Sequence, residues 1–210
     1  MNVIIKRLSP ELAEDYFDFF DNRAFSDDSP YYPCYCNAFN MSAERIHSEI
    51  IEQVDINGGG IEGWQRSLRK SAQNMVEQGE ISGYLAFDHG ISVAWCNAND
   101  KGNYYRFGEF SLDDLPLDEE NVNESGTEKI KSVVCFEIAP EYRGKGLATA
   151  LLRRVCEDAL KDGYEYVEAY PAVKGKGEFD FTGPMRLYEK LGFTIGEQRG
   201  EMLIMRKKLK

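Results

Sequence analysis

Apolar positions in the first third of the chain recur every three or four residues, a spacing typical of amphipathic helices. Ser9-Pro10 predicts the cap and first turn of one helix, and Ser42 is placed to cap a second. Glycines 58–60 would end the second helix, and Gly79 would end a third. The three apolar stripes comprise Leu12, Tyr16, Phe19 and Phe20, then Ile46, Ile50, Ile51 and Val54, then Trp64, Leu68, Ala72, Met75 and Val76. The pattern therefore predicts a helical portion over residues 1–80.

After residue 80 the pattern changes to that of β-strands. Residues 81–87 and 91–96 are short, β-branched and aromatic, and Asp88-His89-Gly90 between them predicts a hairpin. Residues 97–130 are polar and acidic, so we expect a long surface connection there. No internal repeat or second-domain boundary is evident, and residues 1–210 are expected to form a single domain.

A strand–turn–helix–strand unit begins at Lys131. Residues 132–138 predict a buried strand, which Ala139-Pro140 ends. A long amphipathic helix follows, and residues 164–170 predict the next strand. The stripe of this helix is formed by Leu147, Leu151, Val155 and Ala159. The remaining predicted elements are a glycine-rich loop at 174–177, a short helix between Gly183-Pro184 and Gly192, and strands at 193–195 and 202–205.

Composition and charge narrow the classes of partner. With 36 acidic against 25 basic side chains, the formal net charge is −11. That charge disfavours nucleic acid and anionic membranes, which select basic surfaces. It would attract a cationic amine, although its alternative role is only to keep an acidic protein dispersed. The chain shows no secretory signal and no apolar run long enough to span a membrane. Five cysteines at irregular spacing argue against a disulfide framework. We therefore expect a cytoplasmic location.

The glycine turn between the strand at 132–138 and the following helix predicts an anion site. The unpaired N–H groups of a first helical turn point outward, and the helix dipole favours negative charge there. Gly144 and Gly146 allow the backbone to approach a phosphate closely, while Arg143 and Lys145 add positive charge. An ordinary strand–helix turn needs one glycine at most, so this combination favours a phosphate ligand.

Two other phosphate-binding patterns fit the turn less well. A P-loop needs Gly, four residues and then Gly-Lys-Ser/Thr, which the chain does not contain. A dinucleotide fingerprint needs Gly or Ala where Thr149 stands, although Glu165 lies near the usual ribose-binding distance. A nicotinamide-binding oxidoreductase therefore stays open as an alternative, although it would need a larger parallel sheet.

The hexapeptide from Arg143 to Ala148 resembles the Arg/Gln-x-x-Gly-x-Gly/Ala motif of the GNAT superfamily of N-acetyltransferases. As in that family, the motif follows a strand and opens a long amphipathic helix. Residues 187–193 (LYEKLGF) look like the family's Tyr-x-x-x-Gly-Phe ending. The resemblance covers about half of the chain, residues 81–96 and 131–208. Three segments within it are similar to a poorly characterised bacterial subgroup: 132–136, 168–171 and 181–183.

The resemblance implies an α/β fold of the α+β type, with a mixed, mostly antiparallel sheet and helices on both faces. Acetyl-CoA would lie in a split between neighbouring strands, its pantetheine arm bonded to the backbone of Phe136 and Ile138. The pyrophosphate would be bound by the N–H groups of Arg143, Gly144, Lys145, Gly146, Leu147 and Ala148. Residues 1–80 would form the acceptor side, and residues 131–208 the acetyl-CoA-binding core.

Acetyl transfer to an amine needs a neutral amine, a stabilised oxyanion and a proton for the departing thiolate. Tyr188 matches the family's tyrosine that donates to the coenzyme A sulfur; its alternative role is that of a packed aromatic residue. Glu137 is the candidate general base, although strict alternation points it away from the face of Phe136 unless a β-bulge intervenes. Ser132 shares the parity of Phe136 and is a second candidate, for positioning a water.

Cys34 and Cys36 lie in an aromatic linker on the expected acceptor side. A metal site is not expected, because only His47 and His89 are available and neither stands at a zinc-like spacing. The sequence thus predicts an N-acetyltransferase that acts by direct attack on a primary amine of a small molecule or peptide, as a monomer or homodimer. A non-catalytic acyl-CoA-binding or regulatory module on the same fold stays open as the alternative.

Overall fold

A seven-stranded sheet in the order β1-β2-β3-β4-β5-β7-β6 runs through the residues that the computed structural model describes, 3–27, 29–105, 128–174 and 180–210. The strands are β1 (Val3–Arg7), β2 (Gly83–Asp88), β3 (Ile91–Asp100), β4 (Ile130–Ile138), β5 (Tyr166–Ala169), β6 (Thr194–Arg199) and β7 (Met202–Lys208). Only β4 and β5 pair in parallel among the described neighbours. The expected mixed, mostly antiparallel sheet is confirmed.

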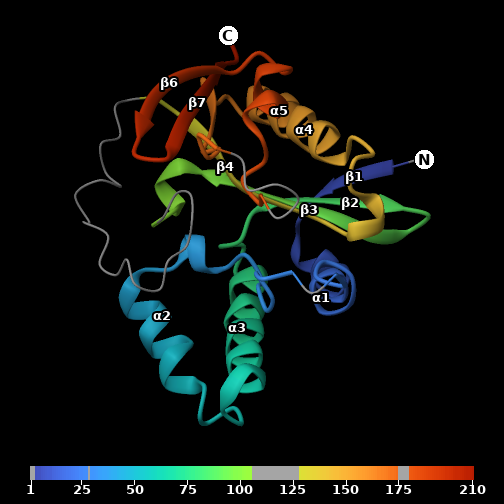
Figure 1. Ribbon diagram of the computed structural model, residues 1–210, viewed down its shortest axis with the longest axis vertical. Helices are drawn as coiled ribbons and strands as arrows, with labels where there is room; N and C mark the ends of the chain where they lie inside the picture. The colour runs from blue at the N-terminus through green and yellow to red at the C-terminus, as the bar shows by residue number, and fades with distance from the viewer. Residues whose placement is uncertain (1–2, 28, 106–127, 175–179) are drawn as a thin grey trace.

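Helices cover both faces of the sheet, as Figure 1 shows. One face carries α1 (Ala13–Asn22), α2 (Ala43–Glu49) and α3 (Gly60–Glu77), and the other carries α4 (Leu147–Lys161) and α5 (Met185–Glu189). Each face has its own hydrophobic cluster, so neighbouring strand residues divide between them: Trp95 packs toward α1, whereas Ala94 and Cys96 pack toward α4. The predicted stripes of α1, α3 and α4 supply most of the buried helical residues, and the predicted hairpin is β2–β3.

The chain begins with a strand that the helical pattern did not predict. β1 pairs antiparallel with β2, from Val3 opposite Asp88 to Arg7 opposite Tyr84. Val3 and Ile5 pack against the α4 side, while Ile4 points outward and is 56% exposed. A strand of five residues is too short for periodicity to separate it from the start of a helix, and its pairing partner lies about eighty residues away.

The second predicted helix is shorter than expected. Ser42 caps α2 by accepting from the Arg45 N–H (3.3 Å), but the helix ends at Glu49 instead of continuing to Val54, and a 3-10 turn (Ile51–Gln53) follows. Adjacent β-branched residues at 50 and 51 weaken the helical preference at this point.

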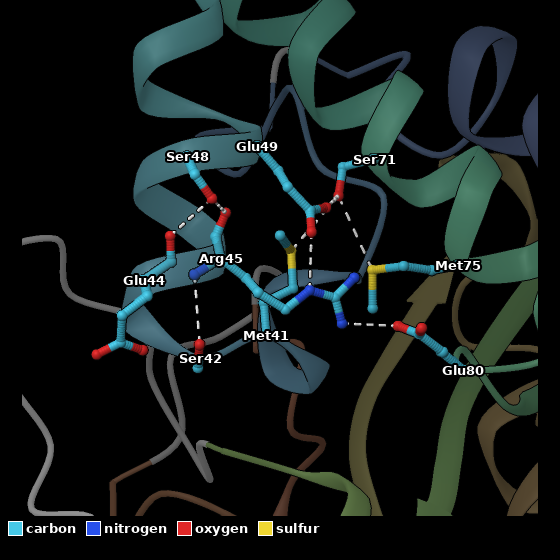
Figure 2. A network of polar contacts seen from close by, with 9 residues as sticks. All are labelled: Met41, Ser42, Glu44, Arg45, Ser48, Glu49, Ser71, Met75 and Glu80. Atoms are coloured by element: carbon cyan, nitrogen blue, oxygen red, sulfur yellow. Dashed lines mark hydrogen bonds and ion pairs between the residues drawn. The ribbon is translucent and has the colours of Figure 1, made fainter.

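A polar network holds α2 against α3 (Figure 2). Arg45 donates from Nε to Glu49 (2.8 Å) and from Nη1 to Glu80 (2.7 Å) beyond the end of α3. Glu49 also accepts from the Ser71 hydroxyl (2.9 Å) on α3. The Arg45 guanidinium thus connects the end of α2 with the chain between α3 and β2.

β4 contains an extra residue that reverses the side-chain alternation. Against β3, Asn97 pairs with Cys135 and Ala98 pairs with Val133, which leaves Val134 without an opposite residue. Val134 and Cys135 accordingly pack on the same face, toward the N-terminal helices. Two residues of β4 that are an even number of positions apart therefore face opposite sides of the sheet when the bulge lies between them.

The predicted surface connection at 97–130 is partly ordered strand. β3 continues to Asp100, and a 3-10 turn follows at Lys101–Asn103. The polar residue Asn97 suggested a surface position, but its side chain is hydrogen-bonded in the interior. It donates to the Cys36 carbonyl (3.0 Å) and accepts from the Tyr104 hydroxyl (2.7 Å). Residues 106–127 of this connection and 175–179 of the glycine-rich loop lie outside the described residues. No helix in the described ranges is both long and apolar enough to cross a membrane.

Candidate active site

The segment from Arg143 to Ala148 joins β4 to α4 through an open turn. Gly144 and Gly146 have φ angles of 72° and 85°, which residues with a side chain avoid. A Cβ at either glycine would meet no atom within 4 Å, so a ligand can approach this backbone. Because Ala150 makes the first helical bond, to the Gly146 carbonyl (3.1 Å), the N–H groups just before it have no carbonyl acceptor within the helix. The turn therefore has the geometry and polarity of an anion site.

The two cations of the turn lie in different places. Lys145 places its Nζ 5.0 Å from the centre of the Tyr142 ring. Arg143 instead turns back toward the sheet, where its guanidinium pairs with Asp27 and its Nε donates to the Ile138 carbonyl (3.1 Å). Sequence reasoning assigned the Arg143 charge to a phosphate and missed Asp27, which stands more than a hundred residues away in the chain.

Glu137 lies on the opposite face of β4 from Phe136, toward the N-terminal helices. It lines a pocket of about 80 Å³ at the end of β4. The lining residues are Ser29, Tyr31, Phe136, Glu137, Ile138, Arg143, Asp180 and Phe181. Burial raises the pKa of Glu137 to about 8, while the Arg143 guanidinium, with Nη2 3.9 Å from Glu137 Oε1, opposes the rise. The carboxyl group is therefore mostly protonated at neutral pH and accepts protons as a carboxylate above pH 8.

Several pocket residues were not predicted as site residues. Ser29 and Tyr31 belong to the linker after α1, and Asp180 and Phe181 precede α5. The signal that could have found them was the aromatic linker itself, since Tyr31 packs edge-on against Phe181 with ring centres 5.1 Å apart.

Tyr188 is fully buried on α5, with 1% of its surface exposed. Its hydroxyl donates to the Thr182 carbonyl, and its ring lies 5.4 Å from that of Phe193. Burial raises the pKa of Tyr188 well above its ordinary value, so the hydroxyl keeps its proton over the working range of pH. The structure therefore shows a packed aromatic residue whose hydroxyl proton is bonded within the chain, and the general-acid role stays a prediction.

At Phe136, the edge of β4 that pairs with β5 earlier in the strand faces a short segment before α5 instead. β5 pairs with β4 only from Ile130 to Val133 and ends at Ala169. Beyond that point the Phe136 N–H donates to the Phe181 carbonyl (2.6 Å). The two strands therefore separate at the position where the family resemblance expects the pantetheine arm.

The expectation that Ser132 shares the cofactor-facing side with Phe136 is wrong, because the bulge at Val134 separates them. Ser132 is buried and shares a hydrogen bond of 2.8 Å with the Tyr170 hydroxyl. Tyr170 donates in turn to Glu168 (2.5 Å), a buried carboxylate that also pairs with cations from two other elements. Ser132 belongs to this structural network and not to the pocket of Glu137.

The cysteines of the aromatic linker pack beside the same strand. Cys36 Sγ lies 3.4 Å from Cys135 Sγ, and the Cys36 N–H donates to Cys34 Sγ (3.3 Å). All are free thiols. The contact with a neighbouring thiol, together with burial, raises the pKa of Cys34 and of Cys36, and burial raises the pKa of Cys135. Within the described residues, no group of three or more His, Cys, Asp or Glu side chains is arranged to hold a metal ion.

Comparison with known proteins gives the context for this geometry. The model of the acetyltransferase (GNAT) family matches residues 61–193, more than half of the chain. An uncharacterized N-acetyltransferase from Methanocaldococcus jannaschii is 37% identical over 60 residues. That alignment covers 29% of this chain and 24% of the relative, so this chain matches only about a quarter of that relative's length.

Solved structures with a similar fold are distant in sequence. A GNAT-family acetyltransferase from Streptococcus pneumoniae superposes with a TM-score of 0.53 at 14% identity, over 100% of both chains. The PaiA N-acetyltransferase from Thermoplasma acidophilum, in complex with coenzyme A, gives 0.50 at 17% identity over 99% of both chains. YncA from Salmonella typhimurium, with its cofactor acetyl-CoA, gives 0.51 at 12% identity over 100% of this chain and 95% of that one. These likenesses establish the fold.

Proposed function

Since this chain belongs to the acetyltransferase (GNAT) family, we propose that it moves the acetyl group of acetyl-CoA to a primary amine by direct attack. The acceptor would be an amine of a small molecule or peptide, and the reaction would need no covalent enzyme intermediate. In this proposal the whole chain is one cytoplasmic domain, with residues 1–80 on the acceptor side and residues 131–208 as the acetyl-CoA-binding core.

The observation that carries the proposal is the open glycine turn at the end of the β4 edge. Gly144 and Gly146 leave room against a row of N–H groups that the helix does not use. This suits the pyrophosphate of coenzyme A. The same edge leads back to Phe136 and Ile138, where β5 no longer pairs with β4. A ligand bound at the turn would therefore extend along the strand toward Glu137.

Acetyl-CoA supplies an activated thioester, and the protein's own groups handle the protons. Glu137 would take the proton of the attacking amine from the acceptor side, with a pKa of about 8 that matches mildly alkaline conditions. Tyr188, buried and protonated, would donate to the departing thiolate from the opposite face. In this proposal the acid, Tyr188, and the base, Glu137, lie on opposite faces of β4, and the thioester would lie between them.

Thermal stabilisation by acetyl-CoA, coenzyme A and NAD(H) tests the cofactor assignment first. A ligand at a hundred times its dissociation constant adds about 2.7 kcal/mol to the free energy of unfolding, a clear rise in Tm. We expect both coenzyme A species to stabilise the parent protein. The Gly146→Glu variant should lose this stabilisation, because a carboxylate would stand where the phosphate binds.

Gly163→Glu is the matched control, because Gly163 ends the same helix region with a similar φ of 80° and equally open surroundings. It carries the same strain and charge change, and should keep the ligand response. Stabilisation by NAD(H) with none by coenzyme A would overturn the proposal. Binding of coenzyme A without turnover of any amine would favour the non-catalytic module.

A further inference from the structure

Two hydrogen-bond donors of the proposed active site are already occupied by one short segment of the chain. The Phe136 N–H donates to the Phe181 carbonyl (2.6 Å), and the Tyr188 hydroxyl donates to the carbonyl of the next residue, Thr182. Both donor residues are buried, Phe136 with 6% and Tyr188 with 1% of the surface exposed. Each would therefore be costly to leave unpaired.

The same segment fills the space between these two residues. A Cβ built on Gly183 would lie 3.5 Å from both Phe136 Cδ2 and Tyr188 Oη. The backbone at 183 is thus wedged between the strand residue and the tyrosine that the proposed function assigns to the pantetheine arm and the sulfur. A pantetheine arm bonded to Phe136 and a sulfur beside Tyr188 would need the space that residues 181–183 occupy.

The segment is held by contacts of its own. The Asp180 carboxylate accepts from the Thr182 N–H (3.2 Å) and from its hydroxyl (2.7 Å), which folds residues 180–182 into a turn. The Phe181 ring packs against Tyr31 and, at 6.2 Å between ring centres, against Phe39. Both aromatic partners belong to the N-terminal linker, so the segment joins the acceptor side to the edge of β4.

We propose that Asp180–Gly183 is an internal plug, which occupies the path of the pantetheine arm in the free protein and leaves it when acetyl-CoA binds. This inference rests on the proposed function. The plug offers carbonyl oxygens to the donors that the cofactor would otherwise satisfy, so opening and binding exchange one set of hydrogen bonds for another. The aromatic contacts of Phe181 are lost when the plug opens. These contacts therefore determine which fraction of the protein is closed in the absence of ligand.

Loosening the plug should therefore tighten cofactor binding. The apparent dissociation constant is the intrinsic one divided by the open fraction, so a variant that opens more readily binds more tightly. Phe181→Ala removes the ring contacts with Tyr31 and Phe39 but keeps the backbone. We expect its Kd for acetyl-CoA, measured by calorimetry without an amine, to fall about tenfold.

Two controls separate a plug from a general packing effect. Phe25→Ala removes a partly buried aromatic residue that packs on the same face, against Phe20 and Tyr32, and should leave the Kd unchanged. The second control is a ligand, 3′-phosphoadenosine 5′-diphosphate, which has the pyrophosphate end of coenzyme A without the arm. Its Kd should be the same for the parent and for Phe181→Ala.

Amide hydrogen exchange in the parent protein gives an independent measurement that needs no variant. Saturating acetyl-CoA should slow exchange at the start of α4 and speed it at Thr182 and Gly183. The plug is ruled out if Phe181→Ala binds acetyl-CoA no more tightly than the parent and if acetyl-CoA makes residues 182–183 of the parent more protected. The proposed function stands in that case, because the parent still binds acetyl-CoA. If neither protein binds acetyl-CoA, the proposed function itself fails.

Discussion

At the scale of single residues, the proposed role of Glu137 as general base makes catalysis depend on pH. Its carboxyl group must lose a proton before it can act as a base, and burial raises its pKa to about 8. We expect kcat/KM for an amine to rise with pH through about 8. Glu137→Gln should abolish this limb of the profile and lower kcat/KM about a hundredfold at pH 9. Initial-rate measurements from pH 6 to 10, following release of the coenzyme A thiol, would test this.

The exposed Glu141 provides the control, because it follows the same strand but has an ordinary solvent environment. Glu141→Gln should keep the parent profile, and a Glu137→Gln enzyme that kept it too would show that another group is the base.

The raised pKa of Glu137 also makes the stability of the protein depend on pH. The folded state holds the Glu137 proton more tightly than the unfolded chain, so stability falls as pH rises from about 4.5 to 8. At pH 9 the Glu137→Gln protein should therefore have the higher Tm.

At the scale of secondary-structure elements, one arginine connects α2 to the chain beyond α3. Arg45 pairs with Glu49 and Glu80 while its side chain is about one-third exposed, and Glu49 is also bonded to Ser71 (Figure 2). Arg45→Met keeps much of the apolar stem but leaves two partly buried carboxylates without their cation. We expect the free energy of unfolding to fall by about 1–2 kcal/mol in urea titrations.

Arg199→Met serves as the comparison, because Arg199 and Glu197 form a pair that is about half exposed at the edge of the sheet. Removing that charge should lower stability much less than Arg45→Met does, because solvent screens an exposed pair. Equal losses in the two variants would mean that the Arg45 network contributes no more than an ordinary surface ion pair.

The elements that the sequence predicted well are those whose own residues determine their structure. The apolar stripes of α3 and α4 and the turn of the β2–β3 hairpin are local signals, and each element formed where expected. β1 escaped prediction because only pairing with β2 distinguishes its five residues from a helix start. The bulge at Val134 left no pattern in the sequence, and it reversed the side assigned to Ser132.

The candidate site was predictable to the same extent. The glycine turn and Glu137 were proposed from one stretch of the chain, and Tyr188 from the family resemblance of residues 187–193; their roles remain predictions. Asp27, Tyr31 and Phe181 were missed because they join the site only through contacts between distant segments. No spacing rule connects residue 27 with residue 143.

At the scale of the whole molecule, the net charge of −11 acts on the two proposed substrates in opposite ways. Amine acceptors are mostly cationic near neutral pH, whereas acetyl-CoA is strongly anionic. Long-range attraction increases the encounter rate of the first and repulsion reduces that of the second, and salt screens both effects. The glycine turn then compensates locally, because its N–H groups and the dipole of α4 favour phosphate at short range.

We therefore expect opposite salt dependences for the two substrates. Raising ionic strength from 0.1 to 1 M shortens the Debye length from about 10 to about 3 Å. Over that range kcat/KM for a cationic amine should fall several-fold, while kcat/KM for acetyl-CoA should stay level or rise. A nucleophile that is neutral at the assay pH, such as hydroxylamine, should lose little. If its rate fell as steeply as that of the cationic amine, salt would be acting on the protein's structure, and the acidic surface would have no part in attracting the acceptor.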